Sequence, residues 1–230
     1  MNDSLQTSYG YAGNGLAVDR QRVLRNTYWL LALSLVPTVL GAWIGVATGL
    51  FQLMSPGMSM IVFFVGAFGL MFVVEKTKDS AAGVAALLAF TFFMGLMLSR
   101  LIGFVLGYRN GTSLVMTAFG GTAAVFFTMA TLATVIKRDL SSMGKFLTVG
   151  AVVLMVACIA NFFLQSSAMM LTILVLMLGV FSAFMLYDIK RVIDGGETNY
   201  ISATLNIYLD IYNVFQSLLS LLGIFGGDRD

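Results

Sequence analysis

Long apolar segments separated by short polar connections dominate the pattern of this chain. Seven segments of roughly 17 to 24 residues are long enough, at about 1.5 Å per residue, to cross a bilayer as helices. They lack the alternation of polar and apolar residues that is typical of strands in membrane barrels. The predicted spans are Thr27–Gly49, Met58–Val74, Ser80–Leu101, Ser113–Ile136, Phe146–Leu164, Ala168–Tyr187 and Ile201–Ile224.

The composition requires lipid to act as the solvent for most of this apolar surface. Hydrophobic residues make up 59% of the chain and charged residues only 10%, whereas a soluble domain carries roughly 25% charged residues. A bilayer admits only helices and closed barrels, because backbone polar groups must bond internally. We therefore predict an all-α membrane protein with one seven-helix transmembrane domain (27–225), a cytoplasmic and largely disordered N-terminal tail (1–26) and a short C-terminal tail (226–230).

Basic residues predict how the spans are oriented, because cytoplasmic connections are enriched in Lys and Arg. With seven alternating spans, three of the 13 basic residues (Arg100, Arg109 and Arg229) lie on the side away from the N-terminus. The N-terminus is therefore expected in the cytoplasm and the C-terminus on the opposite side. The ten basic residues on the N-terminal side are Arg20, Arg22, Arg25, Lys76, Lys78, Lys137, Arg138, Lys145, Lys190 and Arg191.

Several function classes have no residues to support them. There is no histidine, Cys158 is the only cysteine, and the net charge is only +2. His-based catalysis, most zinc sites and nucleic-acid binding are therefore not expected. The chain also lacks phosphate-binding and nucleophile-elbow motifs, so we expect neither an enzyme nor a resident cofactor or metal. If the protein senses pH, carboxylates must do so.

The last predicted span carries a polar stripe. Charged residues inside a membrane are costly, at about 2.5–3.5 kcal/mol on insertion scales, and are therefore functional candidates. Asp210 is the clearest case, and residues at intervals of three and four place it on one helix face that should be central in the bundle. The stripe consists of Asn206, Asp210, Asn213, Ser217 and Ser220.

A second aspartate follows the sixth span, in the run LYDIKR at Asp188. The short connection to the seventh span predicts an antiparallel hairpin, which would place both aspartates in its cytoplasmic half. Two adjacent carboxylates in a low dielectric cannot both ionise cheaply, so Asp188 and Asp210 could share a proton or contact a cation such as Ca²⁺. Two simpler interpretations remain open: Asp188 as a solvated helix end, and Asp210 as a structural hydrogen-bonding residue.

Small residues in the first span predict close helix packing. Gly41, Gly45 and Gly49 recur every four residues, a spacing that lets helix backbones approach each other. Packing within one bundle is favoured over a dimer interface.

The C-terminal sequence LYDIKRVIDGGETNYISATLNIYLDIYNVFQSLLSLLG resembles the signature of the Bax inhibitor-1 family, and the likeness extends over all seven spans. The resemblance implies a seven-helix bundle with the last helix at its centre, and a di-aspartyl pH sensor, Asp188 and Asp210, that gates a calcium or cation leak. Relatives have an arginine near the end of the second helix that bonds the aspartates. This chain has EKTKD there, so Lys76 and Lys78 are the candidate partners, although lysine lacks the bidentate fork of arginine.

The stretches VLRNTYWLLALSL, GLMFVVEKT, GGTAAVFF and GGETNYISAT are similar to a bacterial inner-membrane branch of the family. That resemblance implies binding to the FtsH protease and its companions HflK and HflC, with the N-terminal tail as the handle. Two hypotheses follow: a regulator of FtsH and a pH-gated cation leak channel, with Asn206 and Asn213 as further polar partners in the pore. An intramembrane aspartyl protease is disfavoured, because Asp210 follows YL instead of the G-x-G that such enzymes place before their second aspartate.

Overall fold

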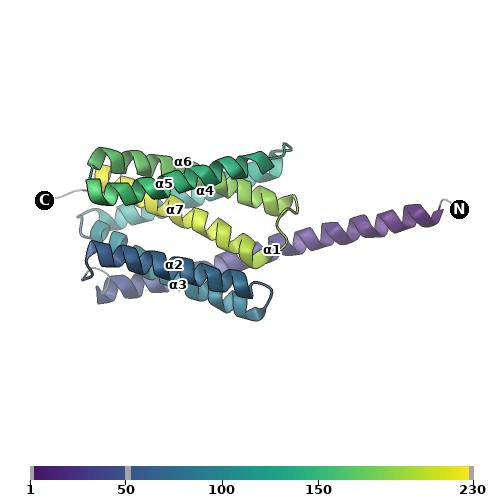
Figure 1. Cartoon of the computed structure of the whole chain (residues 1–230), viewed down its shortest axis with the longest axis horizontal. Coiled ribbons are helices and arrows are strands. Elements are labelled where there is room, and N and C mark those ends of the chain that lie inside the picture. Colours follow the sequence, from purple (N-terminus) through teal and green to yellow (C-terminus); the bar gives the residue numbers. More distant parts are fainter. Residues whose placement is uncertain (1–2, 50–52, 228–230) are drawn as a thin grey trace.

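Seven helices form the part of the chain that the structure, a computed structural model, describes: residues 3–49 and 53–227, with side chains from residue 20 onward. All seven are long and apolar enough to span a membrane, and the described residues contain no strand. The predicted all-α fold is therefore confirmed (Figure 1). The helices are α1 (Asp3–Thr48), α2 (Pro56–Thr77), α3 (Ala81–Leu106), α4 (Gly111–Val135), α5 (Ser141–Leu164), α6 (Ser167–Ile193) and α7 (Tyr200–Gly226).

The N-terminal tail differs from the disordered segment that we expected, because α1 already begins at Asp3. Its first part extends beyond the bundle as a single helix, away from the other six (Figure 1). A helix that is nucleated within a membrane span can continue outward cheaply, since each added residue gains one hydrogen bond. The tail is therefore a helical projection of the first span.

The glycine stripe of α1 packs against α3 within the same chain, as predicted. A Cβ atom added at Gly41 would lie 2.2 Å from the carbonyl oxygen of Phe92, and one at Gly45 would lie 2.3 Å from the Ser99 hydroxyl. From the facing helix, a Cβ at Gly95 would lie 2.1 Å from the carbonyl oxygen of Thr38. Glycines on both helices therefore bring the two backbones into direct contact.

Helix α7 occupies the centre of the bundle. It packs against α1, α2, α3, α4 and α6, and in Figure 1 it crosses obliquely between the groups formed by α5 and α6 and by α2 and α3. Tyr208 is the largest fully buried side chain. Its hydroxyl lies 2.9 Å from the hydroxyl of Thr38 in α1. The most polar span is thus surrounded by protein instead of lipid, as its stripe predicted.

Asn199 fixes the start of α7. Its side-chain oxygen accepts hydrogen bonds from the backbone N–H groups of Ile201 and Ser202, at 2.9 and 3.2 Å. Its side-chain nitrogen donates to the carbonyl oxygen of Lys78 and to the carboxylate of Asp79, in the turn between α2 and α3. One asparagine therefore caps the central helix and ties it to its neighbours.

We expect Asn199→Ala to lower the free energy of unfolding by about 1–2 kcal/mol, the usual cost of removing a helix N-cap. Denaturation of the purified protein in detergent would measure this loss. Thr198→Ala is the matched control, because Thr198 is exposed and precedes the cap. Equal stability of the two variants would contradict the capping role.

Candidate functional site: a pair of aspartates between the last two helices

The site is built by two antiparallel helices joined by a short connection. Helix α6 continues to Ile193, beyond the predicted end at Tyr187, so Asp188 lies within the helix and not at its end. Asp210 lies in the middle of α7 and is only 4% exposed. The hairpin brings the two carboxyl groups within hydrogen-bonding contact of each other. We call these two residues the aspartate pair.

The hydrogen bonds of the aspartate pair depend on a proton. The Oδ2 atom of Asp210 is fully buried, and no donor from the described residues reaches it. Ionised carboxylates only accept hydrogen bonds, so Asp188 and Asp210 can bond to each other only if one of them keeps its proton. When both are charged, they are left with mutual repulsion in a low dielectric.

Two further charged groups act on Asp188: Arg191 from the last turn of α6 and Glu197 from the α6–α7 connection. Arg191 attracts Asp188 and Glu197 repels it. These two groups are themselves partners, with Nη2 of Arg191 3.5 Å from Oε2 of Glu197. Arg191 is exposed, and its Nε also donates to the carbonyl oxygen of Gly196. The cation beside the pair is therefore shared with other acceptors and does not clamp both aspartates.

The asparagines of the polar stripe lie near the pair but have different roles in the fold. The side-chain nitrogen of Asn213 donates to the carbonyl oxygen of Leu209, one turn earlier in the same helix, at 2.8 Å. Asn206 is half-buried one turn before Asp210. Ser217 completes the buried part of the stripe, and its hydroxyl has no bonding partner among the described residues. The same face of α7 therefore carries two buried oxygens, Oδ2 of Asp210 and Oγ of Ser217, that accept no hydrogen bond from the described residues.

The family is decided by comparison with known proteins. Residues 20–227 match the family model described as inhibitor of apoptosis-promoting Bax1. The chain belongs to the Bax inhibitor-1 family. The predicted resemblance is therefore confirmed, and the match includes all seven spans and both aspartates.

Curated relatives of this Bax inhibitor-1 family member include several bacterial proteins. The chain is 39% identical to the modulator of FtsH protease YccA of Escherichia coli K12, over 90% of this chain and 92% of that protein. It is also 39% identical to an uncharacterised protein of Pseudomonas aeruginosa, over 92% and 95% of the two chains. An uncharacterised membrane protein of Vibrio cholerae is 36% identical, over 92% and 93%. A relative in Escherichia coli O6:H1 is named an inner membrane protein. That name and the seven apolar helices support a multi-pass inner-membrane protein, and the names of the relatives point to no known enzyme.

The two lysines predicted as partners of the aspartates, Lys76 and Lys78, are engaged elsewhere. Nζ of Lys78 lies 2.7 Å from the carboxylate of Glu75, one turn earlier. The hydrogen bond to Glu75 raises the pKa of Lys78 above its usual value. Nζ of Lys76 lies 5.3 Å from the centre of the Phe72 ring, in a cation–π contact. The structure thus brings neither lysine to the aspartate pair.

We expect Lys78→Gln to leave any pH response of the aspartate pair unchanged, because its partner is Glu75 and not an aspartate. Surface ion pairs of this kind contribute only about 0–1 kcal/mol. Stability measured from pH 5 to pH 9 should give the same curve for the variant and the unmodified protein. A curve that changes shape would place Lys78 in the pair's environment after all.

Sequence reasoning missed two groups that the structure places between helices. Glu75 reaches across from α2 and accepts a hydrogen bond from the hydroxyl of Ser202, at the start of α7. Arg100 was counted only as a topological charge, yet it lies inside α3 and faces a cavity. An arginine within a predicted span (Ser80–Leu101) was the available signal, since intramembrane charges are rarely without purpose.

No cluster of three or more potential metal ligands occurs in the described part of the chain.

Proposed function

We propose that this protein binds an FtsH-type membrane protease and modulates its activity. The observation that carries the proposal is the 39% identity to the Escherichia coli modulator, which extends over 92% of that relative. Because the similarity continues through every span, we infer that the two proteins share an interaction partner as well as a fold. That relative is named a modulator of the protease.

The N-terminal projection of α1 is the part of the molecule best placed to meet a protease. It extends beyond the bundle as a single helix (Figure 1). It leaves the bundle on the side where the basic residues predict the cytoplasm. A membrane protease with a cytoplasmic active site could reach such a segment without unfolding any transmembrane helix. We therefore propose this projection as the handle, with HflK and HflC as further members of the complex.

Co-purification from native bacterial membranes tests the proposal. Tagged protein should retain FtsH, together with HflK and HflC, and overexpression should slow the degradation of another FtsH substrate. A variant lacking residues 1–19 should lose the protease while keeping its fold, whereas Asp139→Asn, an exposed change between α4 and α5, should keep it. Failure to retain FtsH together with an unchanged rate of substrate degradation would remove the proposal.

We propose a second candidate function, a pH-gated leak of calcium or another cation, because one observation favours it specifically. Asp210 is buried in the central helix, Asp188 is half-buried in the helix beside it, and the two carboxyl groups can stay bonded only with a proton. Loss of that proton would create a concentrated negative charge, which would separate α6 from α7 or attract a cation. Such an element has two arrangements whose balance depends on pH.

Flux into liposomes separates this candidate from the first. Vesicles that contain the purified protein and a calcium-sensitive dye should show flux that depends on pH. Asp210→Asn should abolish the pH dependence, and Asp139→Asn should preserve it. The absence of flux at every pH from 5 to 9 would eliminate the leak and would leave the proposal on FtsH unaffected.

A further inference from the structure

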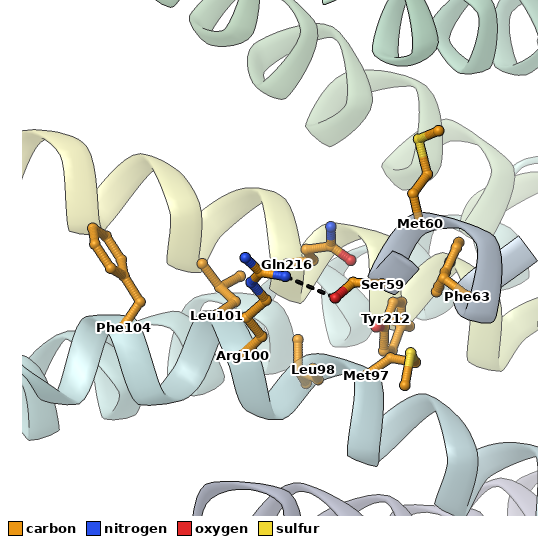
Figure 2. Close-up of a pocket in the computed structure, with 10 residues that line it drawn as sticks. All are labelled: Ser59, Met60, Phe63, Met97, Leu98, Arg100, Leu101, Phe104, Tyr212 and Gln216. Carbon is orange, nitrogen blue, oxygen red and sulfur yellow. Dashed lines mark hydrogen bonds between the residues drawn. The ribbon is translucent and has the colours of Figure 1, made fainter. Parts of the chain in front are cut away.

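A cavity that neither aspartate of the pair lines contains a charged residue of a transmembrane helix. Its volume is about 460 Å³, and it lies between α2, α3 and α7. Figure 2 shows Arg100 of α3 beside the cavity, next to Ser59 of α2 and Gln216 of α7. Most of the remaining lining is apolar and includes Phe63 and Met97. The cavity therefore combines one cationic end with an apolar wall.

Arg100 has unused hydrogen-bonding capacity. The two bonds that the structure gives it both use Nη1, at 2.7 Å to the hydroxyl of Ser59 and at 3.4 Å to the carbonyl oxygen of Met54. No carboxylate of residues 20–49 and 53–227 forms an ion pair with it. A guanidinium presents five N–H groups in a planar fork that suits carboxylates and phosphates. The described protein supplies Arg100 with neutral acceptors only.

Arg100 lies close enough to one end of α3 for its side chain to reach lipid headgroups. It precedes the end of α3 at Leu106 by six residues, which is about 9 Å along the helix axis. Ser59 lies in the first turn of α2, at the same end of the bundle. A long arginine side chain can extend toward the interface from this depth. On both helices the apolar lining continues toward the membrane centre, to Phe63 and Met97.

We propose that this cavity is a binding site for an anionic phospholipid. The phosphate would accept hydrogen bonds from the free N–H groups of Arg100, and an acyl chain would lie along Phe63 and Met97. The ten lining residues include one cation and no carboxylate. The amine of a zwitterionic lipid would find no counter-charge, whereas a lipid with one net negative charge neutralises the site. The charge of the lining thus selects phosphatidylglycerol over phosphatidylcholine.

Native mass spectrometry of the purified protein, titrated with phosphatidylglycerol or phosphatidylcholine, measures this preference directly. We expect phosphatidylglycerol to bind more tightly and Arg100→Gln to weaken it about tenfold, as loss of a charge-assisted contact predicts. Arg138→Gln removes an exposed arginine elsewhere and should bind as the unmodified protein does. Equal binding of the two lipids, or equal binding by Arg100→Gln and Arg138→Gln, would overturn the proposal.

Two further variants separate lipid binding from a purely structural role. Ser59→Ala removes the 2.7 Å bond to Arg100 but keeps the cation, so phosphatidylglycerol should still bind. Met97→Trp fills the apolar wall and should exclude the acyl chain while leaving the charge in place. Loss of binding in Ser59→Ala, or retention in Met97→Trp, would contradict the site. Competition by inorganic phosphate at millimolar concentration would show that the site takes an ion only.

Cross-linking identifies the occupant in native membranes. A benzophenone amino acid at position 97 should form, on illumination, an adduct with the mass of a phospholipid. An adduct with the mass of a protein would mean that a partner helix occupies the cavity, and that result would overturn the lipid assignment.

Discussion

Alanine in place of Gly95 is expected to lower the free energy of unfolding by about 3 kcal/mol, at the upper end of the usual cost of overpacking. The added methyl would lie 2.1 Å from the carbonyl oxygen of Thr38 and 2.8 Å from its carbonyl carbon. These are backbone atoms, so no side-chain rotation can relieve the clash and α1 must move away from α3. That movement would also disturb Thr38 and its contact with Tyr208 at the centre of the bundle.

Gly120→Ala is the matched control for this prediction, because a Cβ atom at that position in α4 meets nothing within 4 Å. Alanine should there be neutral, or stabilising by up to about 1 kcal/mol, since it has the higher helix propensity. Denaturant unfolding of both variants in the same detergent provides the comparison. Similar stabilities would show that the contact between α1 and α3 is loose.

Stability that falls as pH rises is the second expected result, and it depends on the aspartate pair. At low pH at least one carboxyl of Asp188 and Asp210 holds a proton, and the hydrogen bond between α6 and α7 is intact. As the pH rises and both ionise, the bond is replaced by repulsion at a site where the Asp210 side chain is buried. The loss should reach several kcal/mol, the cost of breaking a buried charged interaction. The charge of Arg191 attracts the Asp188 carboxylate and the charge of Glu197 repels it, so the two effects on Asp188 partly cancel.

Asp210→Asn should remove this pH dependence, because an amide can donate a hydrogen bond to Asp188 whether or not a proton is available. Melting temperatures of the purified variant and of the unmodified protein, measured from pH 5 to pH 9, provide the comparison. Asp139→Asn is the control. Hydrogen bonds from Ser141 hold the pKa of Asp139 below its usual value, so Asp139 stays ionised throughout that range. A slope that survives in Asp210→Asn would mean that other groups set the response.

The sequence predicted the spans and the central helix because these depend on local pattern. Hydropathy located seven segments, and intervals of three and four residues placed the polar face of α7 inward, where Asp210 and Ser217 are indeed buried. Helix ends were harder to predict, because charged side chains tolerate burial when they find a partner. Lys190 is only 8% exposed and bonds to Asp194 at 2.8 Å, so α6 continues well past its apolar segment.

Contacts between helices could not be predicted from the pattern of polar and apolar residues. The short connection between α6 and α7 implied that Asp188 and Asp210 could meet, since hairpin geometry limits where the two helices can lie. No comparable geometric restriction placed Lys78 near the aspartates. Its partner is Glu75, which lies three residues earlier, in α2. The position of Arg100 beside Ser59 likewise depends on how α2 and α3 pack. A single helix does not contain that information.

The central position of α7 has a consequence for how the protein is made. This helix is the last of the seven to be synthesised, so the first six must wait in the membrane around an incomplete interior. Its mean hydropathy of 1.4 is the lowest of the seven, and it therefore depends most on protein neighbours for insertion. Until it arrives, Asp188 faces no carboxyl partner and Thr38 has no tyrosine to bond. The nascent bundle would then expose unpaired polar groups to lipid. Such groups distinguish an incomplete membrane protein from a complete one.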